Sequence, residues 1–349
     1  MPAGREVESH VAVNLLVAAL LVGGVFLTLA ARRSELWRAA GRDLLRRRPI
    51  AIALIALYVL VALLDSVSWI GGGEVTEGGS TLALHQPRSI VDRTFRQDFR
   101  ERSYSAPLAD VEFYDGSPLD HPGAHLLGTD ILGRDVLHLT LKGTRVALLI
   151  GGLTSLIVIP LALLMGVSAG YFGGRVDDVV FFLVSTLASI PTLLLLIALI
   201  MALGRGPVQV CIAMGVTGWV GFCRIVRGET FKLRELDYVQ AARALGVSEA
   251  RIIFRHILPN LMHLVVITFV LLFSGLVLSE AILSYLGIGI DGSWGQMIDQ
   301  ARDELARDPI IWWNLASAST ALFILILAVN FVGDAVRDIL DPRTLRERE

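Results

Sequence analysis

Cysteine and charge are both scarce in this chain of 349 residues. Its two cysteines, Cys211 and Cys223, fall inside one apolar run, which excludes a disulfide framework and a metal site built on spaced cysteines. We interpret both as small packing residues. Charged residues make up 18% of the chain and the formal net charge is −2, a balance that argues against nucleic acid as a partner.

Two stretches have the glycine spacing of nucleotide-binding motifs, but neither has the other features that such a site requires. The stretch GTDILGRD (128–135) has the glycine spacing of a phosphate loop, but Arg134 and Asp135 stand where a lysine and a hydroxyl residue would bind phosphate and magnesium. The stretch GIGIDG (287–292) matches the glycine pattern of dinucleotide sites, yet it follows a long apolar run instead of a strand. Neither stretch predicts a nucleotide site.

Catalytic and metal-binding constellations are missing too. No group of cysteine and histidine residues has metal-ligand spacing, and serine, histidine and aspartate occur only as a scattered set. His256 and His263 could share a helical face, but Pro259 between them is expected to break the helix, so we interpret both as interfacial side chains. We therefore expect that the chain is not an enzyme and binds no cofactor and no metal.

Apolar sequence is what the chain has in abundance. Hydrophobic residues make up 54% of it, and its mean hydropathy is +0.63. Because a membrane-spanning helix needs about 20 apolar residues, the sequence predicts seven spans, at roughly 11–31, 50–70, 144–169, 179–203, 208–226, 261–286 and 313–333. The expected fold class is all-α, that of a polytopic integral membrane protein.

Arginine placement predicts the orientation of these spans. The segment 32–48 holds seven arginines against Glu35 and Asp43, which is typical of a cytoplasmic loop. Alternation then places 71–133, 204–209 and 287–312 outside, with the N-terminus outside and the C-terminus in the cytoplasm. The first apolar run is long for a secretory signal and ends in Ala-Ala-Arg-Arg, so we expect it to be retained.

The same patterns predict the domain organisation. We divide the chain into an extra N-terminal transmembrane helix with its arginine-rich segment (1–48), a transmembrane domain (49–342) and a short cytoplasmic tail (343–349). Within the transmembrane domain, the composition of 71–133 predicts an extracytoplasmic cap of limited structure. The stretch 227–260 is expected to be a charged cytoplasmic loop, although a plain connection between two spans needs only a handful of residues.

The second half of that loop, DYVQAARALGVSEARIIFRHILPN (237–260), has a helical pattern. Tyr238, Ala241, Ala242 and Leu245 fall at i, i+3, i+4 and i+7 and so share one face of a helix. Small residues in the middle of a face allow a close approach to another surface. Gln240 lies on the opposite face, which we expect to be solvated.

Glycine and serine predict how the loop turns. Gly246 should end the first helix in a left-handed cap, and Ser248 should cap a second helix with Glu249 at its positive end. Pro259 either closes that second helix or opens the next span. This helix-glycine-helix bracket has two interpretations, an interfacial elbow that stabilises helix ends or a helix that docks into a groove of a cytoplasmic partner.

As a motif, QAARALG followed by RHILP resembles the EAA loop signature of binding-protein-dependent ABC importer permeases, E-A-A-x3-G-x9-I-x-L-P. Gln240 stands in place of the glutamate and His256 in place of an isoleucine. The resemblance covers roughly 48–342, and the motifs look like those of the second permease subunit of dipeptide and oligopeptide importers, a group that includes nickel permeases. Its further motifs are HLLGTDILGRDVLHLTLKGTRVALLIG (125–151), GYFGGRVDD (170–178), SIPTLLLLIAL (189–199), SEAILSYLGIGI (279–290) and VGDAVRDILDP (332–342).

The resemblance implies a six-helix, MetI-like permease core in the bacterial cytoplasmic (inner) membrane, to which the first span is an addition. It implies three kinds of protein partner: a homologous second permease subunit, one or two cytoplasmic ABC ATPases that hydrolyse the ATP, and an extracytoplasmic substrate-binding protein. The expected function is the translocation path for di- or oligopeptides or similar small solutes. The residues carried over to the ATPase-docking helix are Tyr238, Gln240, Ala241, Ala242 and Gly246, and those that frame the loop are Ser248, Leu258 and Pro259.

Glu280 and Pro191 stand out inside predicted spans. An unpaired charge at mid-bilayer costs on the order of 3 kcal/mol, so Glu280 suggests a functional site. Its structural alternative is a carboxylate near the outer interface that pairs with a backbone amide or with a cation of a neighbouring subunit. Pro191 should kink the fourth span. Glu280 also leaves open a proton-coupled secondary transporter, and a membrane scaffold without translocation is a third possibility.

Overall fold

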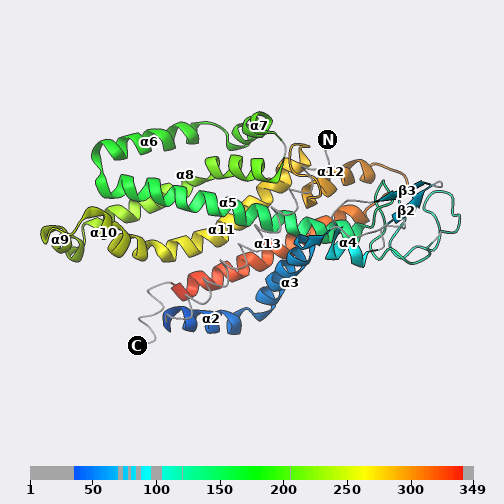
Figure 1. Cartoon of the computed structure of the whole chain (residues 1–349), viewed down its shortest axis with the longest axis horizontal. Coiled ribbons are helices and arrows are strands. Elements are labelled where there is room, and N and C mark those ends of the chain that lie inside the picture. Colours follow the sequence, from blue (N-terminus) through cyan, green and yellow to red (C-terminus); the bar gives the residue numbers. More distant parts are fainter. Residues whose placement is uncertain are drawn as a thin grey trace. The chain divides into compact units, whose positions relative to one another are not determined.

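The computed structural model of the chain describes residues 35–69, 74–77, 80–83, 88–95, 104–119, 121–204 and 206–340 (Figure 1). The predicted first span (11–31) and the tail (343–349) lie outside these residues. The chain divides into two compact units, unit 1 (Met1–Leu148 and Gly292–Ala328) and unit 2 (Leu149–Asp291 and Val329–Glu349). Two long helices, α5 (Val136–Phe172) and α13 (Trp313–Leu340), run from one unit into the other.

Unit 1 combines helices with four short strands among its described residues. The strands pair in antiparallel fashion as two separate hairpin-like sheets, β1 with β4 and β2 with β3, with Ser68 opposite Ser89 and Glu74 opposite Ala83. Besides the ends of α5 and α13, its elements are α2 (Glu35–Arg47), α3 (Pro49–Ser66), β1 (Ser68–Trp69), β2 (Glu74–Glu77), β3 (Ser80–Ala83), β4 (Arg88–Ser89), α4 (Ile90–Thr94) and α12 (Trp294–Leu305).

In the described part of unit 2, the regular elements are all helices, joined by short turns. Figure 1 shows its two short helices, α9 and α10, between the longer α8 and α11. Its elements, besides the ends of α5 and α13, are α6 (Gly174–Ser189), α7 (Thr192–Leu203), α8 (Pro207–Arg234), α9 (Asp237–Ala244), α10 (Glu249–Ile252), the π-helix η1 (Ile253–Ile257) and α11 (Leu258–Tyr285).

Five helices in the described part of the chain are long and apolar enough to cross a membrane, and they coincide with five of the predicted spans. They are Pro49–Ser66, Val136–Phe172, Pro207–Arg234, Glu249–Tyr285 and Trp313–Ile339. The pair α6 and α7 gives a sixth crossing if the two helices count as one span. Long apolar runs therefore predicted the positions of the crossings well, because helix length in a bilayer follows from its thickness.

Pro191 breaks the predicted fourth span. Helix α6 ends at Ser189, Pro191 occupies the N-cap position of α7, and the axes of the two helices differ by 92°. Proline has no N–H to donate and its ring clashes with the preceding turn, so a helix that meets it can end there. The predicted kink is confirmed, and the second helix runs almost at a right angle to the first.

Helix α12 lies where the sequence predicted only an external connection. Ser293 caps it by accepting a hydrogen bond from the backbone N–H of Gln296 at 3.2 Å. Trp294 is buried, and its indole N–H donates to the carbonyl oxygen of Thr140 on α5 at 2.8 Å. A Cβ at Gly143 would come within 2.4 Å of the indole ring, so α5 accepts Trp294 only because position 143 has no side chain.

The stretch GTDILGRD builds a turn. The carboxylate of the fully buried Asp130 accepts hydrogen bonds from the backbone N–H groups of Leu132 and Arg134 at 2.9 and 2.8 Å. It also pairs with the Arg134 guanidinium, with Oδ2 to Nε at 2.8 Å and to Nη2 at 2.7 Å. Asp130 and Arg134, of which Arg134 stands in the place of a phosphate-loop lysine, therefore hold the backbone of this turn in place.

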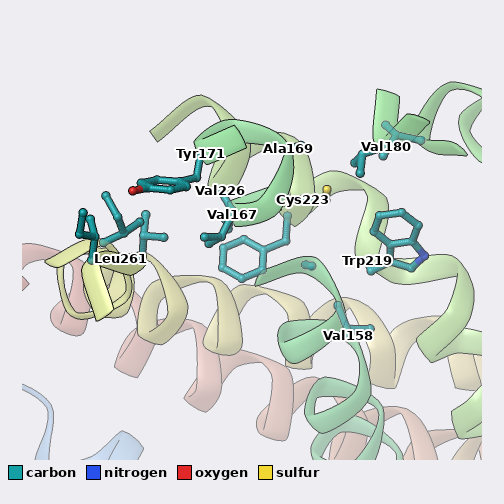
Figure 2. Close-up of a cluster of buried hydrophobic side chains, with 14 of the residues drawn as sticks. Val158, Val167, Ala169, Tyr171, Val180, Trp219, Cys223, Val226 and Leu261 are labelled. Carbon is teal, nitrogen blue, oxygen red and sulfur yellow. The ribbon is translucent and has the colours of Figure 1, made fainter. Parts of the chain in front are cut away.

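The core of unit 2 lies where α5 packs on α8. Cys211 and Cys223 are free and buried, which confirms their interpretation as packing residues. Figure 2 shows Val167, Trp219 and Val226 in the apolar cluster beside Cys223. A Cβ at Gly166 of α5 would stand 2.8 Å from the backbone oxygen of Cys223, so the two helices approach almost backbone to backbone.

A buried carboxylate joins α4 to the start of α5 in unit 1. Asp92 is 7% exposed, and its carboxylate receives hydrogen bonds from the backbone N–H of Ser89 at 3.0 Å, from His138 Nε2 at 2.9 Å and from Lys142 Nζ at 2.6 Å. Burial alone would raise the pKa of Asp92, but the hydrogen bonds from His138 and Lys142 outweigh it and hold that pKa well below its usual range. The Ser89 hydroxyl continues the network to Asp65 at 2.8 Å.

Asp92→Asn should lower the thermal stability of the purified protein by an amount equivalent to about 1–3 kcal/mol, because it leaves the Lys142 cation without its counter-charge. A depressed pKa stabilises the fold above the unfolded-state value and loses that effect as the pH falls, so the deficit should shrink only below about pH 4. Thermal unfolding in detergent measures both. Asp110→Asn, at an exposed carboxylate, is the control, and equal melting temperatures for the two variants would contradict this account.

Candidate functional site: the 237–260 loop

The loop between α8 and α11 is a helix-glycine-helix bracket, as the sequence predicted. Helix α9 ends at Ala244, and Gly246 has a positive φ of 76°. The backbone N–H of Gly246 donates to Arg243 at 3.0 Å and that of Val247 donates to Ala242 at 3.1 Å. These two bonds satisfy carbonyls at the end of α9 and reverse the chain, a geometry that glycine adopts without steric cost.

Ser248 and Glu249 begin the second arm. Ser248 has the extended backbone of an N-cap, but its side chain makes no capping bond, so the predicted position is right and the predicted hydrogen bond is wrong. Glu249 lies in the first turn of α10, and its carboxylate accepts a hydrogen bond from the hydroxyl of Tyr171 on α5. The carboxylate of Glu249, which the sequence placed at the positive end of this helix, is therefore engaged by Tyr171.

Pro259 opens α11 and does not interrupt the helix. Residues Glu249–Tyr285 form one continuous helical stretch, so the expectation that Pro259 breaks the helix between His256 and His263 is wrong. The turn before it is a π-helix, in which the N–H of Leu258 donates to the carbonyl of Ile253, five residues back. This change of hydrogen-bond register accommodates a residue that has no N–H of its own.

The face predicted for docking is divided by the fold. Tyr238, Ala241 and Leu245 are exposed, Leu245 to 83%, but Ala242 is partly buried and packs against the unit 2 core. The fully buried residue of α9 is Val239, which the sequence pattern did not single out. The prediction that Ala242 lies on the exposed face with Tyr238, Ala241 and Leu245 is therefore wrong. Helix α9 turns Ala242 toward the core together with Val239.

The remaining loop residues are placed as follows. Gln240 is exposed, as predicted, and its amide donates to the backbone oxygen of Glu235 at 3.1 Å. Leu258 packs against the unit 2 core, and Pro259 is exposed. On the outer side of the bracket, the Asn260 amide donates to the Tyr238 hydroxyl at 3.1 Å, so the first turn of α9 is tied to the first turn of α11.

The two loop histidines make local contacts. The ring of His256 lies 5.9 Å from the ring of Tyr238, centroid to centroid. His263 Nδ1 donates to the backbone oxygen of Asn260 at 2.8 Å. The His256 ring therefore lies between α9 and the start of α11, while His263 bonds within α11, and the interfacial role of both stays a prediction.

Glu280 is buried in α11 and takes part in a helix-end contact. The Ser284 hydroxyl donates to Glu280 Oε1 at 2.5 Å and accepts a hydrogen bond from the backbone N–H of Ile290 at 3.0 Å. A Cβ at Gly289 would stand 1.8 Å from the same hydroxyl, so glycine is required there. This geometry favours the structural interpretation of Glu280, in which Ser284 relays the carboxylate to a backbone amide.

Sequence reasoning missed the residues that fasten the loop to the rest of unit 2. Arg243 lies with its guanidinium 5.1 Å from the centre of the Tyr171 ring, and a hydrogen bond to the tyrosine raises the pKa of Arg243. The Arg234 guanidinium, at the end of α8, donates to the backbone oxygen of Gly170 at 3.0 Å. Tyr171 lies in GYFGGRVDD, whose order and composition give no sign of a partner some 70 residues further along.

Comparison with known proteins identifies the kind of molecule. Residues 159–346 match the model of the family described as "Binding-protein-dependent transport system inner membrane component", more than half of the chain. The chain belongs to this family. It is a multi-pass permease subunit of a bacterial ABC importer in the inner membrane, a class that works with ATPase and substrate-binding components. The all-α fold class expected from the sequence is confirmed.

Individual relatives extend the match beyond the family segment. The permease is 36% identical to the oligopeptide transport system permease protein OppC of Bacillus subtilis over 222 residues, 63% of this chain and 72% of the relative. It is 34% identical over 306 residues to a putative peptide transport system permease protein of Brucella suis, covering 86% and 90% of the two chains. A solved structure of the MetNI methionine ABC transporter aligns with a TM-score of 0.48 and 20% identity, covering 58% of this chain and 97% of that one.

Proposed function

We propose that this permease carries di- or oligopeptides, or similar small solutes, across the inner membrane. The relatives named for peptide transport support this substrate class, and one of them aligns over 90% of its length. We further propose that the chain binds no cofactor and leaves ATP hydrolysis to its partners. Its N-terminus lies outside and its C-terminus in the cytoplasm in this proposal, as the arginines of 32–48 favour.

Its partners in the proposal are a homologous second permease subunit, one or two cytoplasmic ATPases and an extracytoplasmic substrate-binding protein. The ATPase docks on the outer face of α9, at Tyr238, Ala241 and Leu245. The observation that carries this assignment is the 83% exposure of Leu245, the highest among the exposed large apolar side chains described, at the turn of a charged loop. Isolated apolar side chains of this size at a turn are suited to insertion into a groove of a partner.

The roles within the loop follow from burial. Gly246 and Ser248 shape the turn, while Ala242 and Leu258 pack the bracket on the unit 2 core and so position the docking face. Gln240 stays at the rim, where it holds Glu235 at the end of α8. ATP-driven movement of the partner would then shift the bracket as one body together with α8 and α11.

The test is uptake by the reconstituted importer. The permease is co-expressed with the proteins of its neighbouring reading frames, purified through a tag on the permease and placed in liposomes with a mixed di- and tripeptide library. We expect ATP-dependent accumulation of peptides, quantified by mass spectrometry, that a protonophore leaves unchanged. A partner ATPase with its phosphate-loop lysine replaced is the control. Uptake that collapses with the protonophore while ATP is present, or that needs no ATPase, would support a proton-coupled carrier instead.

A further inference from the structure

Tyr171, the penultimate residue of α5, lies between the apolar core and the loop. It is 3% exposed and belongs to the unit 2 core cluster. Figure 2 shows its ring beside the cluster and its hydroxyl directed away from Val226 and Val167. A tyrosine in this position combines an apolar body, which packs, with a polar tip, which requires a partner when buried.

That polar tip meets both arms of the loop. The hydroxyl donates to Glu249 Oε2 in the first turn of α10, and the guanidinium of Arg243 in the last turn of α9 lies 5.1 Å from the ring centre. Arg243 Nε and Glu249 Oε1 are 3.7 Å apart. One side chain of α5 therefore contacts a residue before Gly246 and a residue after it.

Helix α5 is not adjacent to the loop in the chain, because α6, α7 and α8 lie between them, so its coupling to the loop depends on such contacts. The loop joins α8 and α11 through the backbone, so a displacement of the loop reaches those two helices directly. It reaches α5, which is 37 residues long, only through packing and side-chain bonds. Besides the Tyr171 contacts, Arg234 donates to the backbone oxygen of Gly170 and ties the end of α8 to the same turn of α5.

Stability alone is a weak explanation for these charges. The side chains of Arg243 and Glu249 are 47% and 50% exposed, and exposed ion pairs contribute little to folding because solvent screens them. Each charge also suits its own helix end, since a cation stabilises a C-terminus and an anion an N-terminus. Neither effect requires the Tyr171 hydroxyl, which is the group that brings the two arms to α5.

We propose that Tyr171, Arg243 and Glu249 form a clamp through which movement of the loop is passed to α5. The three are positioning residues, and the inference rests on the proposed docking of an ATPase on the outer face of α9. With the clamp closed, α5 moves with α9 and α10 as one body. With the hydroxyl bond removed, the ATPase still docks and hydrolyses ATP, but part of each loop displacement is lost before it reaches the translocation path.

The experiment measures peptide molecules accumulated per ATP hydrolysed, in the reconstituted importer with the di- and tripeptide library. The variants are Tyr171→Phe, which keeps the ring in the core and leaves both charges at their helix ends, and Glu249→Ala, which removes the acceptor at a half-exposed side chain. We expect each to lower the ratio about fivefold, with ATPase retention and basal hydrolysis unchanged. The double variant should be no worse than Tyr171→Phe alone, because both substitutions remove the bond between Tyr171 and Glu249. Tyr285→Phe removes an exposed tyrosine hydroxyl of unit 2 and is the matched control.

The outcomes separate the clamp from the docking proposal. An unchanged ratio in Tyr171→Phe, or losses that simply add in the double variant, would overturn the clamp while leaving docking intact. A fall in bound ATPase in both single variants would also overturn it, because the residues would then serve docking itself. If the wild-type permease retains no ATPase at all, the proposed function fails first. A lowered ratio in Tyr171→Phe, at protein yield and ATPase retention equal to those of Tyr285→Phe, supports the clamp.

Discussion

Ala241→Glu should reduce ATP-driven uptake by the reconstituted importer at least about tenfold, with the permease still inserted and stable. Ala241 is exposed on α9, so the free subunit tolerates a carboxylate there. In the proposed complex the same carboxylate would be buried in a groove without a counter-charge, and the desolvation penalty of several kcal/mol exceeds the 1.4 kcal/mol that corresponds to each factor of ten in affinity. The measurements are ATPase co-purification with the tagged permease and peptide uptake in liposomes.

Position 241 is a sharper test than position 242. Ala242 is partly buried against the unit 2 core, so a glutamate there would disturb packing and docking together. Ala306→Glu places the same charge on an exposed alanine at the end of α12, outside the loop, and should leave uptake unchanged. Normal uptake and normal ATPase retention in Ala241→Glu would show that the outer face of α9 is not the docking surface.

The spans and the turn at Gly246 were predictable because local sequence determines them. A run of apolar residues long enough to cross a bilayer leaves a helix as its one stable conformation in lipid. At Gly246 the absence of a side chain permits the positive φ of 76° that the reversal needs. Pro191 was likewise visible as a break, although its size, a bend of 92°, depends on packing that the pattern does not contain.

The faces of short helices were predicted less well. An eight-residue helix such as α9 shows barely two turns of periodicity, so Tyr238, Ala241 and Leu245 could be grouped with Ala242 as well as without it. The fold decided the matter through Val239, which is fully buried. The prediction that Pro259 breaks the helix was wrong for a related reason. The effect of this proline depends on whether the preceding turn can widen into the π-helix Ile253–Ile257.

Contacts between distant segments could not be predicted at all. Tyr171 and Glu249 are joined by the fold, and nothing in the local pattern around either residue indicates the other. The same holds for Trp294, whose indole bonds to Thr140 of α5. The family resemblance predicted a docking role for the loop, but it did not predict which residues hold the loop to α5. The contacts of Tyr171 with Glu249 and Arg243 are visible only in the structure.

The packing of α5 on α8 makes a second strong prediction. Gly166 and Gly170 are one helical turn apart on α5 and face α8, where Cβ atoms would stand 2.8 Å from the Cys223 oxygen and 2.7 Å from the Arg227 oxygen. Backbone atoms cannot rotate away as a side chain can, so a methyl group at either position must push the helices apart. Gly166→Ala should therefore destabilise the permease by about 1–3 kcal/mol.

The matched control is Gly152→Ala on the same helix, which should raise the stability that Gly166→Ala lowers. A Cβ at Gly152 would meet no atom within 4 Å, so Gly152→Ala adds only helix propensity, worth up to about 1 kcal/mol. Thermal unfolding of the two variants in one detergent measures the difference, and Gly166→Ala should melt on the order of 5 °C below Gly152→Ala. Because Tyr171 follows Gly170 directly, separation of α5 from α8 should also weaken the clamp and lower the peptide-to-ATP ratio in Gly170→Ala. Equal melting temperatures and an unchanged ratio would show that the two helices are not in close contact in the membrane.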